Sequence, residues 1–88
     1  MHVRIIKTTS LFNKHYRKLP AKVKEKAKEK EKIFRASAFD PRLRTHKLHG
    51  QDNDSWAFWV DYTYRIKFIF LGEDEILFLD VGTHDVYN

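Results

Sequence analysis

The second half of the chain alternates hydrophobic and polar residues with a period of two. The even positions carry the hydrophobic side chains, namely Trp56, Phe58, Val60, Tyr62, Tyr64, Ile66, Phe68 and Phe70. This period is typical of β-strands that bury one face. Because a single unbroken strand of this length would be unusual, we predict a turn at 61–63 and a hairpin with YRIKFIF as its second arm.

Two further strands are predicted at the ends of the chain. ILFLDV (76–81) follows a turn at LGEDE and is almost entirely hydrophobic, which indicates a central strand or one covered on both faces. HVRIIK (2–7) is rich in β-branched residues and predicts a short N-terminal strand.

Two helices are predicted between the N-terminal strand and the hairpin. Residues 8–10, TTS, offer N-caps to a short helix whose apolar stripe is Phe12, Tyr16 and Leu19. Pro20 ends that helix and suits the first turn of a longer one within LPAKVKEKAKEKEKIFRAS. The narrow apolar face of the longer helix consists of Val23, Ala27, Ile33 and Phe34.

The segment FDPRLRTHKLHG (39–50) breaks the helical pattern. Asp40 and Pro41 indicate one turn, Gly50 with QDNDS indicates another, and a short strand is predicted around 45–49. The chain is therefore predicted to be a single α+β domain over 1–88: an N-terminal strand, a helical hairpin, and a three- to four-stranded, mainly antiparallel sheet with the helices on one face. The odd-numbered Trp59, Arg65 and Lys67 then point to the uncovered face, where a site can form.

The composition favours a folded, soluble protein. Of the 88 residues, 42% are hydrophobic and 15% aromatic, and the chain has no cysteine, which excludes disulfides and thiolate metal sites. We expect neither a membrane span nor a signal peptide, and therefore a cytoplasmic location. The net charge of +5 favours a polyanion or an acidic protein as partner.

The most conspicuous charged run is KEKAKEKEK (24–32), which at first suggests a nucleic-acid patch. Opposite charges fall three residues apart at Lys22 and Glu25, and again at Glu29 and Lys32. A solvated helix face is the better interpretation of this run.

Five features in order resemble the RelE/ParE toxin superfamily of bacterial toxin–antitoxin systems. They are the first strand, the helical pair FNKHYRKLPAKVKEKAKEKEKIF, DPRLRTHKLHG, YRIKFIF and LDVGTHDVY, and they cover nearly the whole chain. The ending GTH and the first histidine of THKLHG are most similar to the YafQ-like ribonucleases. The resemblance implies an endoribonuclease that cleaves mRNA in the ribosomal A site without metal or other cofactor, and a cognate antitoxin as partner.

Metal-free RNA cleavage needs a base, an acid and cationic groups that stabilise charge on the phosphate. The resemblance implies His84 as general acid, His46 as general base or orienting group, and Arg65 as the phosphate ligand. Candidate RNA contacts are Trp59 for base stacking, Lys47 and Lys67 for flanking phosphates, and Tyr87 as a counterpart of a tyrosine near the end of RelE-like relatives.

Several alternatives stand beside these roles. His84 can cap the last strand, Arg65 can pair with Asp61 or Asp80, and Trp59 can serve packing or an antitoxin interface. His2, His15 and His49 are interpreted as surface residues, and no metal site is expected. YafQ-like relatives carry a further histidine and an aspartate in the hairpin, where this chain has Trp59 and Thr63. A ParE-like inhibitor of DNA gyrase and an inactive homologue therefore remain alternatives.

Overall fold

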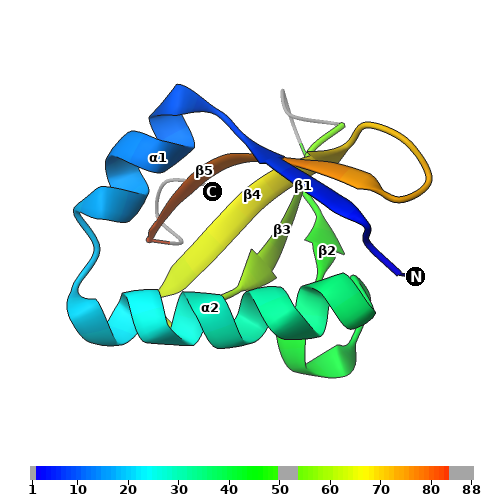
Figure 1. Cartoon of the computed structure of the whole chain (residues 1–88). Coiled ribbons are helices and arrows are strands. Elements are labelled where there is room, and N and C mark those ends of the chain that lie inside the picture. The colour runs from blue at the N-terminus through cyan, green and yellow to red at the C-terminus, as the bar shows by residue number, and fades with distance from the viewer. Residues whose placement is uncertain (1, 50–53, 84–88) are drawn as a thin grey trace.

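The architecture is a five-stranded sheet with two helices, and the computed structural model describes residues 2–49 and 54–83 of it (Figure 1). The elements are β1 (Ile5–Thr8), α1 (Ser10–Arg17), α2 (Ala21–Ala36), the 3-10 helix η1 (Pro41–Leu43), β2 (His46–Lys47), β3 (Trp56–Trp59), β4 (Tyr64–Phe70) and β5 (Glu75–Thr83). This order confirms the predicted α+β class.

The strand order in the sheet is β1-β5-β4-β3-β2. β1 runs parallel to β5, whereas the pairs β5–β4, β4–β3 and β3–β2 are antiparallel. Figure 1 shows α2 crossing one face of the sheet and α1 lying beside β5. The last strand is therefore an inner one, as its continuous hydrophobic run predicts.

Both helices begin where the capping residues predict, whereas α1 ends at Arg17, before the predicted Leu19. The Thr9 hydroxyl accepts a hydrogen bond from Phe12 N (3.0 Å) and caps α1, and Pro20 occupies the N-cap position of α2. All residues of α2 are described, and the ion pair formed within this helix joins Arg35 Nε to Glu31 Oε2 at 3.3 Å. The pairs expected three residues apart are not formed, although the lysine-rich face is solvated as predicted.

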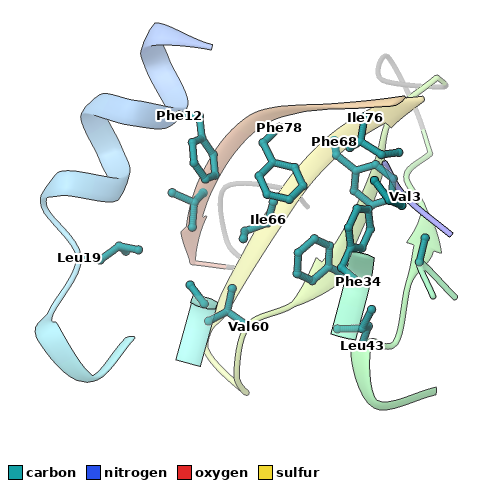
Figure 2. Packing of buried hydrophobic residues seen from close by; sticks show 14 of the residues in the cluster. Val3, Phe12, Leu19, Phe34, Leu43, Val60, Ile66, Phe68, Ile76 and Phe78 are labelled. Carbon is teal, nitrogen blue, oxygen red and sulfur yellow. The ribbon is translucent and has the colours of Figure 1, made fainter. Parts of the chain in front are cut away.

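The hydrophobic core centres on Phe34, which is completely buried. Its ring lies 4.7 Å from that of Phe58, 5.0 Å from Phe68 and 5.7 Å from Phe78, so one α2 side chain contacts three strands (Figure 2). The even-numbered residues of the hairpin pack in this core as predicted. Tyr62 is the exception, with 80% exposure, because it lies in the turn between β3 and β4.

A β-bulge interrupts the pairing of β4 with β5. Lys67 pairs with Asp80, but the next residue, Phe68, pairs with Phe78, so β5 contains one extra residue, Leu79. The bulge reverses the alternation of β5, because a residue that has no partner shifts all later side chains to the other face. The valine at position 81 is consequently buried in the core, with 2% exposure.

Two predicted strands differ in extent from the observed ones. The first strand is predicted at 2–7 but forms at Ile5–Thr8, because Val3 N donates to Arg35 O (2.8 Å) at the end of α2 instead of joining the sheet. The strand predicted around 45–49 is reduced to His46–Lys47. The predicted turn at Gly50 falls largely outside the described residues. In the described part, neither helix has the length and apolar composition needed to cross a membrane.

Candidate functional site

The face of the sheet opposite the helices carries a row of cross-strand partners from β3, β4 and β5. Trp59 pairs with Arg65, and Arg65 pairs with Gly82. Directly opposite residues in a sheet point to the same side. We call this side, which bears Ala57, Trp59, Arg65, Lys67 and Gly82, the helix-free face. It is the side on which the sequence predicts a site.

Arg65 is the central side chain of this face and is buried, with 8% exposure. Its Nη1 donates to the carbonyl oxygens of Asp61 (2.8 Å), Tyr62 (2.8 Å) and Tyr64 (3.2 Å), which closes the turn between β3 and β4. Burial lowers the pKa of Arg65, and the nearby Asp61 opposes this shift. The guanidinium remains charged at neutral pH because its ordinary pKa is so high.

The predicted alternative that Arg65 pairs with Asp61 or Asp80 is wrong. The Asp61 carboxylate instead accepts from Thr63 N (2.9 Å) and Tyr64 N (2.7 Å), and the Asp80 carboxylate is bound by His15 (2.6 Å). Arg65 Nε and Nη2 donate to none of the described residues. The turn thus fixes one edge of the guanidinium, whereas the donors of the other edge have no acceptor among residues 2–49 and 54–83.

Trp59 lies against two guanidinium groups. The Cζ atom of Arg65 is 3.9 Å from the ring centroid, and that of Arg44 is 4.5 Å from it. Both distances are in the range of cation–π contacts. The two guanidinium groups are therefore close, and the charge of Arg44 adds to the lowering of the Arg65 pKa that burial causes. Trp59 therefore gathers two arginines that are far apart in the sequence.

Arg44 is a site residue that the sequence analysis missed. It adopts a left-handed backbone conformation, with φ of 51° and ψ of 40°, directly after η1. The completely buried Leu43 and a hydrogen bond from the Thr45 hydroxyl to Ala38 O hold the chain on either side of it. No local pattern marks Arg44, because its proximity to Trp59 depends on how this loop packs against β3.

The loop that carries Arg44 begins with a capped turn. The Asp40 carboxylate accepts from Arg42 N (2.9 Å), Arg42 Nε (3.0 Å) and Arg42 Nη2 (2.9 Å). These bonds lower the pKa of Asp40 to about 2, and hydrogen bonding to the Arg42 side chain has the largest effect.

Asp40→Asn is expected to make unfolding less dependent on pH in acid. A carboxylate whose pKa is lowered by folding stabilises the native state above its unfolded pKa, here 3.8, and this stabilisation is lost as the pH falls towards about 2. Urea unfolding of both proteins at several values between pH 5 and pH 2 measures the difference. Asparagine also caps helices, so the comparison isolates the charge. A constant difference over this range would contradict the prediction.

His46 is exposed and belongs to the helix-free face, because it pairs with Ala57. Its Nδ1 lies 2.9 Å from Arg44 O. A carbonyl oxygen only accepts, so Nδ1 carries the hydrogen and the neutral ring presents a lone pair on Nε2. Lys67 lies directly across β3 from His46, two strand spacings or about 10 Å away, and Arg65 lies two residues further along β4. In the tautomer that donates to Arg44 O, Nε2 is the ring nitrogen that can accept a proton.

The two predicted lysines lie on different faces. Lys67 pairs with Ala57 and Asp80 and belongs to the helix-free face. Lys47 pairs with Trp56, whose ring packs against the core, so Lys47 lies on the face that the helices cover. The structure thus brings together His46, Trp59, Arg65 and Lys67 from the predicted set, adds Arg44, and separates Lys47 from them.

The remaining histidines and Tyr87 have varied positions. His84 and Tyr87 lie outside the described residues. His2 and His49 are exposed as predicted, but His15 is not a simple surface residue, since its Nδ1 lies 2.6 Å from Asp80 Oδ1. Within residues 2–49 and 54–83, no three histidine or acidic side chains gather into a group that could hold a metal ion.

Neither a family model nor a curated protein matches this sequence. Solved structures do match it. The YoeB/ParE toxin from Agrobacterium tumefaciens is 14% identical, with a TM-score of 0.78 and 92% of this chain and 99% of that chain covered. The E. coli DinJ-YafQ toxin-antitoxin complex gives 17% identity, a TM-score of 0.70 and 94% coverage of both chains. The archaeal RelE-RelB complex from Pyrococcus horikoshii OT3 gives 18% identity, a TM-score of 0.71, and 94% and 96% coverage. At such identities these matches show the fold, which is that of the RelE/ParE toxins.

Proposed function

We propose that this chain is the toxin of a type II toxin–antitoxin pair and a metal-independent endoribonuclease that cleaves mRNA in the ribosomal A site. The observation that carries the proposal is the cationic cluster on the helix-free face, in which Arg44 and Arg65 both contact Trp59. The shared fold with YafQ and RelE structures supports it. A buried arginine whose Nε and Nη2 donate to none of the described residues suits an anionic ligand, because an uncompensated charge in such a place is costly.

The proposed reaction is attack of a ribose 2′ oxygen on the adjacent phosphorus atom. A base takes the 2′-OH proton, the bond between phosphorus and the 5′ oxygen breaks, and an acid protonates that oxygen. The products are a 2′,3′-cyclic phosphate and a 5′-OH end. Negative charge develops on the phosphate oxygens during this step, and donors that are already in place lower the barrier.

The described residues suit three of these tasks. Arg65 is proposed to bind the scissile phosphate through Nε and Nη2, assisted by Arg44, since a guanidinium can donate two parallel hydrogen bonds to phosphate. His46 is proposed as the base. Because its Nδ1 is bonded to Arg44 O, the lone pair on Nε2 remains accessible for the proton. Trp59 and Lys67 are proposed to contact an unstacked base and a neighbouring phosphate.

His84 is proposed as the general acid. It directly follows the last residue of β5, and Gly82, two residues earlier, pairs with Arg65 on the helix-free face. Histidine can donate a proton near neutral pH. Tyr87 is the remaining candidate near the carboxyl terminus, as either an acid or an RNA contact.

The proposed partner is an acidic antitoxin segment that covers the cationic cluster. The matching structures include complexes, DinJ-YafQ and RelE-RelB. The net charge of this chain is +5, and Trp59 adds apolar surface beside Arg44 and Arg65. A segment that folds on binding can neutralise the arginine charges and at the same time bury the apolar surface of Trp59. Such a partner would compete with RNA.

Cleavage of mRNA on purified ribosomes, with metal-free protein and the Mg²⁺ that keeps the ribosomes intact, tests the function. We expect the chain to cut an end-labelled message bound to ribosomes and to leave 2′,3′-cyclic phosphate ends, because no step needs a metal ion from the protein. DNA supercoiling by gyrase, measured in parallel, should be unaffected. A chain that leaves the message intact and blocks gyrase would be a ParE-like inhibitor, and one that does neither would be an inactive homologue.

A further inference from the structure

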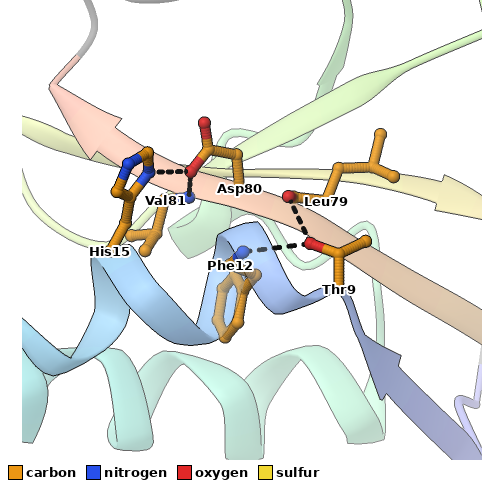
Figure 3. A network of polar contacts seen from close by, with 6 residues as sticks. All are labelled: Thr9, Phe12, His15, Leu79, Asp80 and Val81. Atoms are coloured by element: carbon orange, nitrogen blue, oxygen red, sulfur yellow. Dashed lines mark hydrogen bonds and ion pairs between the residues drawn. The ribbon is translucent and has the colours of Figure 1, made fainter.

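The start of α1 is bound to β5 at the site of the bulge (Figure 3). Thr9 N donates to Phe78 O (3.1 Å), and the Thr9 hydroxyl donates to Leu79 O (2.7 Å). One helical turn and a half further on, His15 Nδ1 lies 2.6 Å from Asp80 Oδ1. Residues at both ends of the bulge are thus held by one short helix.

These bonds satisfy backbone groups at the bulge and directly after it. A bulge leaves an extra residue without a ladder partner, and a polar backbone group that has no partner is costly when it is buried. The Thr9 hydroxyl satisfies Leu79 O, and the Asp80 carboxylate satisfies Val81 N at 2.8 Å. The Asp80 side chain is only 14% exposed, and His15 holds the same oxygen.

The bulge determines which residues of β5 face the cationic cluster. With the extra residue in place, Val81 is buried in the core, and Gly82 pairs with Arg65 on the helix-free face. Without it, strict alternation would turn Val81 towards Arg65 and direct the side chain of Asp80 into the core. Burial of a carboxylate there would be unfavourable. The geometry of the cleavage site therefore depends on Leu79 remaining bulged.

We propose that Thr9 and His15 are positioning residues for RNA cleavage, which hold the β5 bulge and thereby place the end of β5 beside Arg65. This inference rests on the function proposed above. Neither residue needs to contact RNA in this role. A carboxylate only accepts hydrogen bonds, so His15 acts by donating from Nδ1, and its Nε2 takes no part.

Two conservative pairs of variants separate positioning from other roles. His15→Asn keeps an N–H donor near the place of Nδ1, whereas His15→Leu removes it. Thr9→Ser keeps the hydroxyl for both Leu79 O and the cap of α1, whereas Thr9→Val removes it. Lys26→Gly is the control for loss of stability. Glycine has a low helix propensity, so this exposed substitution destabilises α2 without changing a contact to β5.

Single-turnover cleavage on ribosomes and RNA affinity are measured for all five variants. We expect His15→Leu and Thr9→Val to lose about tenfold in cleavage rate, below the roughly 100-fold that a 1 Å misplacement can cause. Their RNA affinity should stay within about twofold of the parent, because the cations remain in place. The asparagine, serine and glycine variants should cleave within about threefold of the parent rate, since a retained donor preserves the bulge.

Amide chemical shifts of Val81, Gly82 and Thr83 provide a readout that does not depend on activity. These shifts should change in His15→Leu and Thr9→Val and should match those of the parent in His15→Asn and Thr9→Ser. If the parent does not cleave RNA, the proposed function fails, and these shifts alone decide whether α1 positions β5. Unchanged shifts in His15→Leu would overturn the inference. Equal loss of cleavage in His15→Asn and His15→Leu would also overturn it, because the imidazole itself would then be required.

Discussion

His84→Gln is expected to slow RNA cleavage by roughly 10² to 10⁴-fold, because an amide cannot protonate the leaving 5′ oxygen. This loss corresponds to about 3 to 5 kcal/mol of barrier. Binding to RNA and to ribosomes should be nearly normal, since the cationic cluster is intact. The free energy of unfolding should change by less than about 1 kcal/mol, as for most substitutions away from a packed core. Single-turnover cleavage, ribosome binding and thermal unfolding measure these three quantities.

His49→Gln is the matched control for this substitution. His49 is exposed and hydrogen-bonds to none of the described residues, so the same chemical change there should leave cleavage at the parental rate. A folded His84→Gln protein that cleaves as fast as the parent would make His84 a strand cap at most. The acid would then have to be sought at His46 or Tyr87. Unfolding of the variant would instead assign His84 a structural role.

Arg65→Ala is expected to impair both folding and cleavage, because one side chain serves the turn and the proposed phosphate contact. The carbonyls of Asp61, Tyr62 and Tyr64 lose their common donor, and Trp59 loses a cation–π contact. Hydrogen bonds to charged groups contribute about 1.5 to 3 kcal/mol, so a loss of about 2 kcal/mol of stability is expected. Cleavage should fall by roughly 10² to 10³-fold, as when one donor to a developing oxyanion is removed. Urea unfolding and single-turnover cleavage measure the two losses.

Arg44→Ala is the matched variant for Arg65. Arg44 is exposed and contacts the same tryptophan, but its guanidinium donates to no described carbonyl. Its removal should change stability by less than about 0.5 kcal/mol, because surface substitutions have small effects. It should still weaken RNA affinity and make that affinity less dependent on salt, because one phosphate contact is lost. If Arg65→Ala loses stability but cleaves normally, the arginine only organises the turn and does not bind phosphate.

The local features of this protein can be predicted from its amino-acid sequence alone. The alternation from Trp56 to Phe70 predicts which side chains pack in the core, and a turn at 61–63 is required because no strand continues so far. Thr9 and Pro20 mark helix ends, since capping depends on residues within one turn. The position of Trp59, Arg65 and Lys67 on the helix-free face follows from the same period of two.

Features that join distant segments or depend on strand register follow from the packing of the whole chain. Arg44 reaches Trp59 through the packing of a loop, and His15 meets Asp80, 65 residues later in the chain. The bulge at Leu79 cannot be read from ILFLDV, because a strand that is hydrophobic throughout does not reveal which side chains share a face. The position of Lys47 could not be predicted for a related reason. A two-residue strand shows no alternation, so only the pairing of Lys47 with Trp56 reveals which face of the sheet Lys47 lies on.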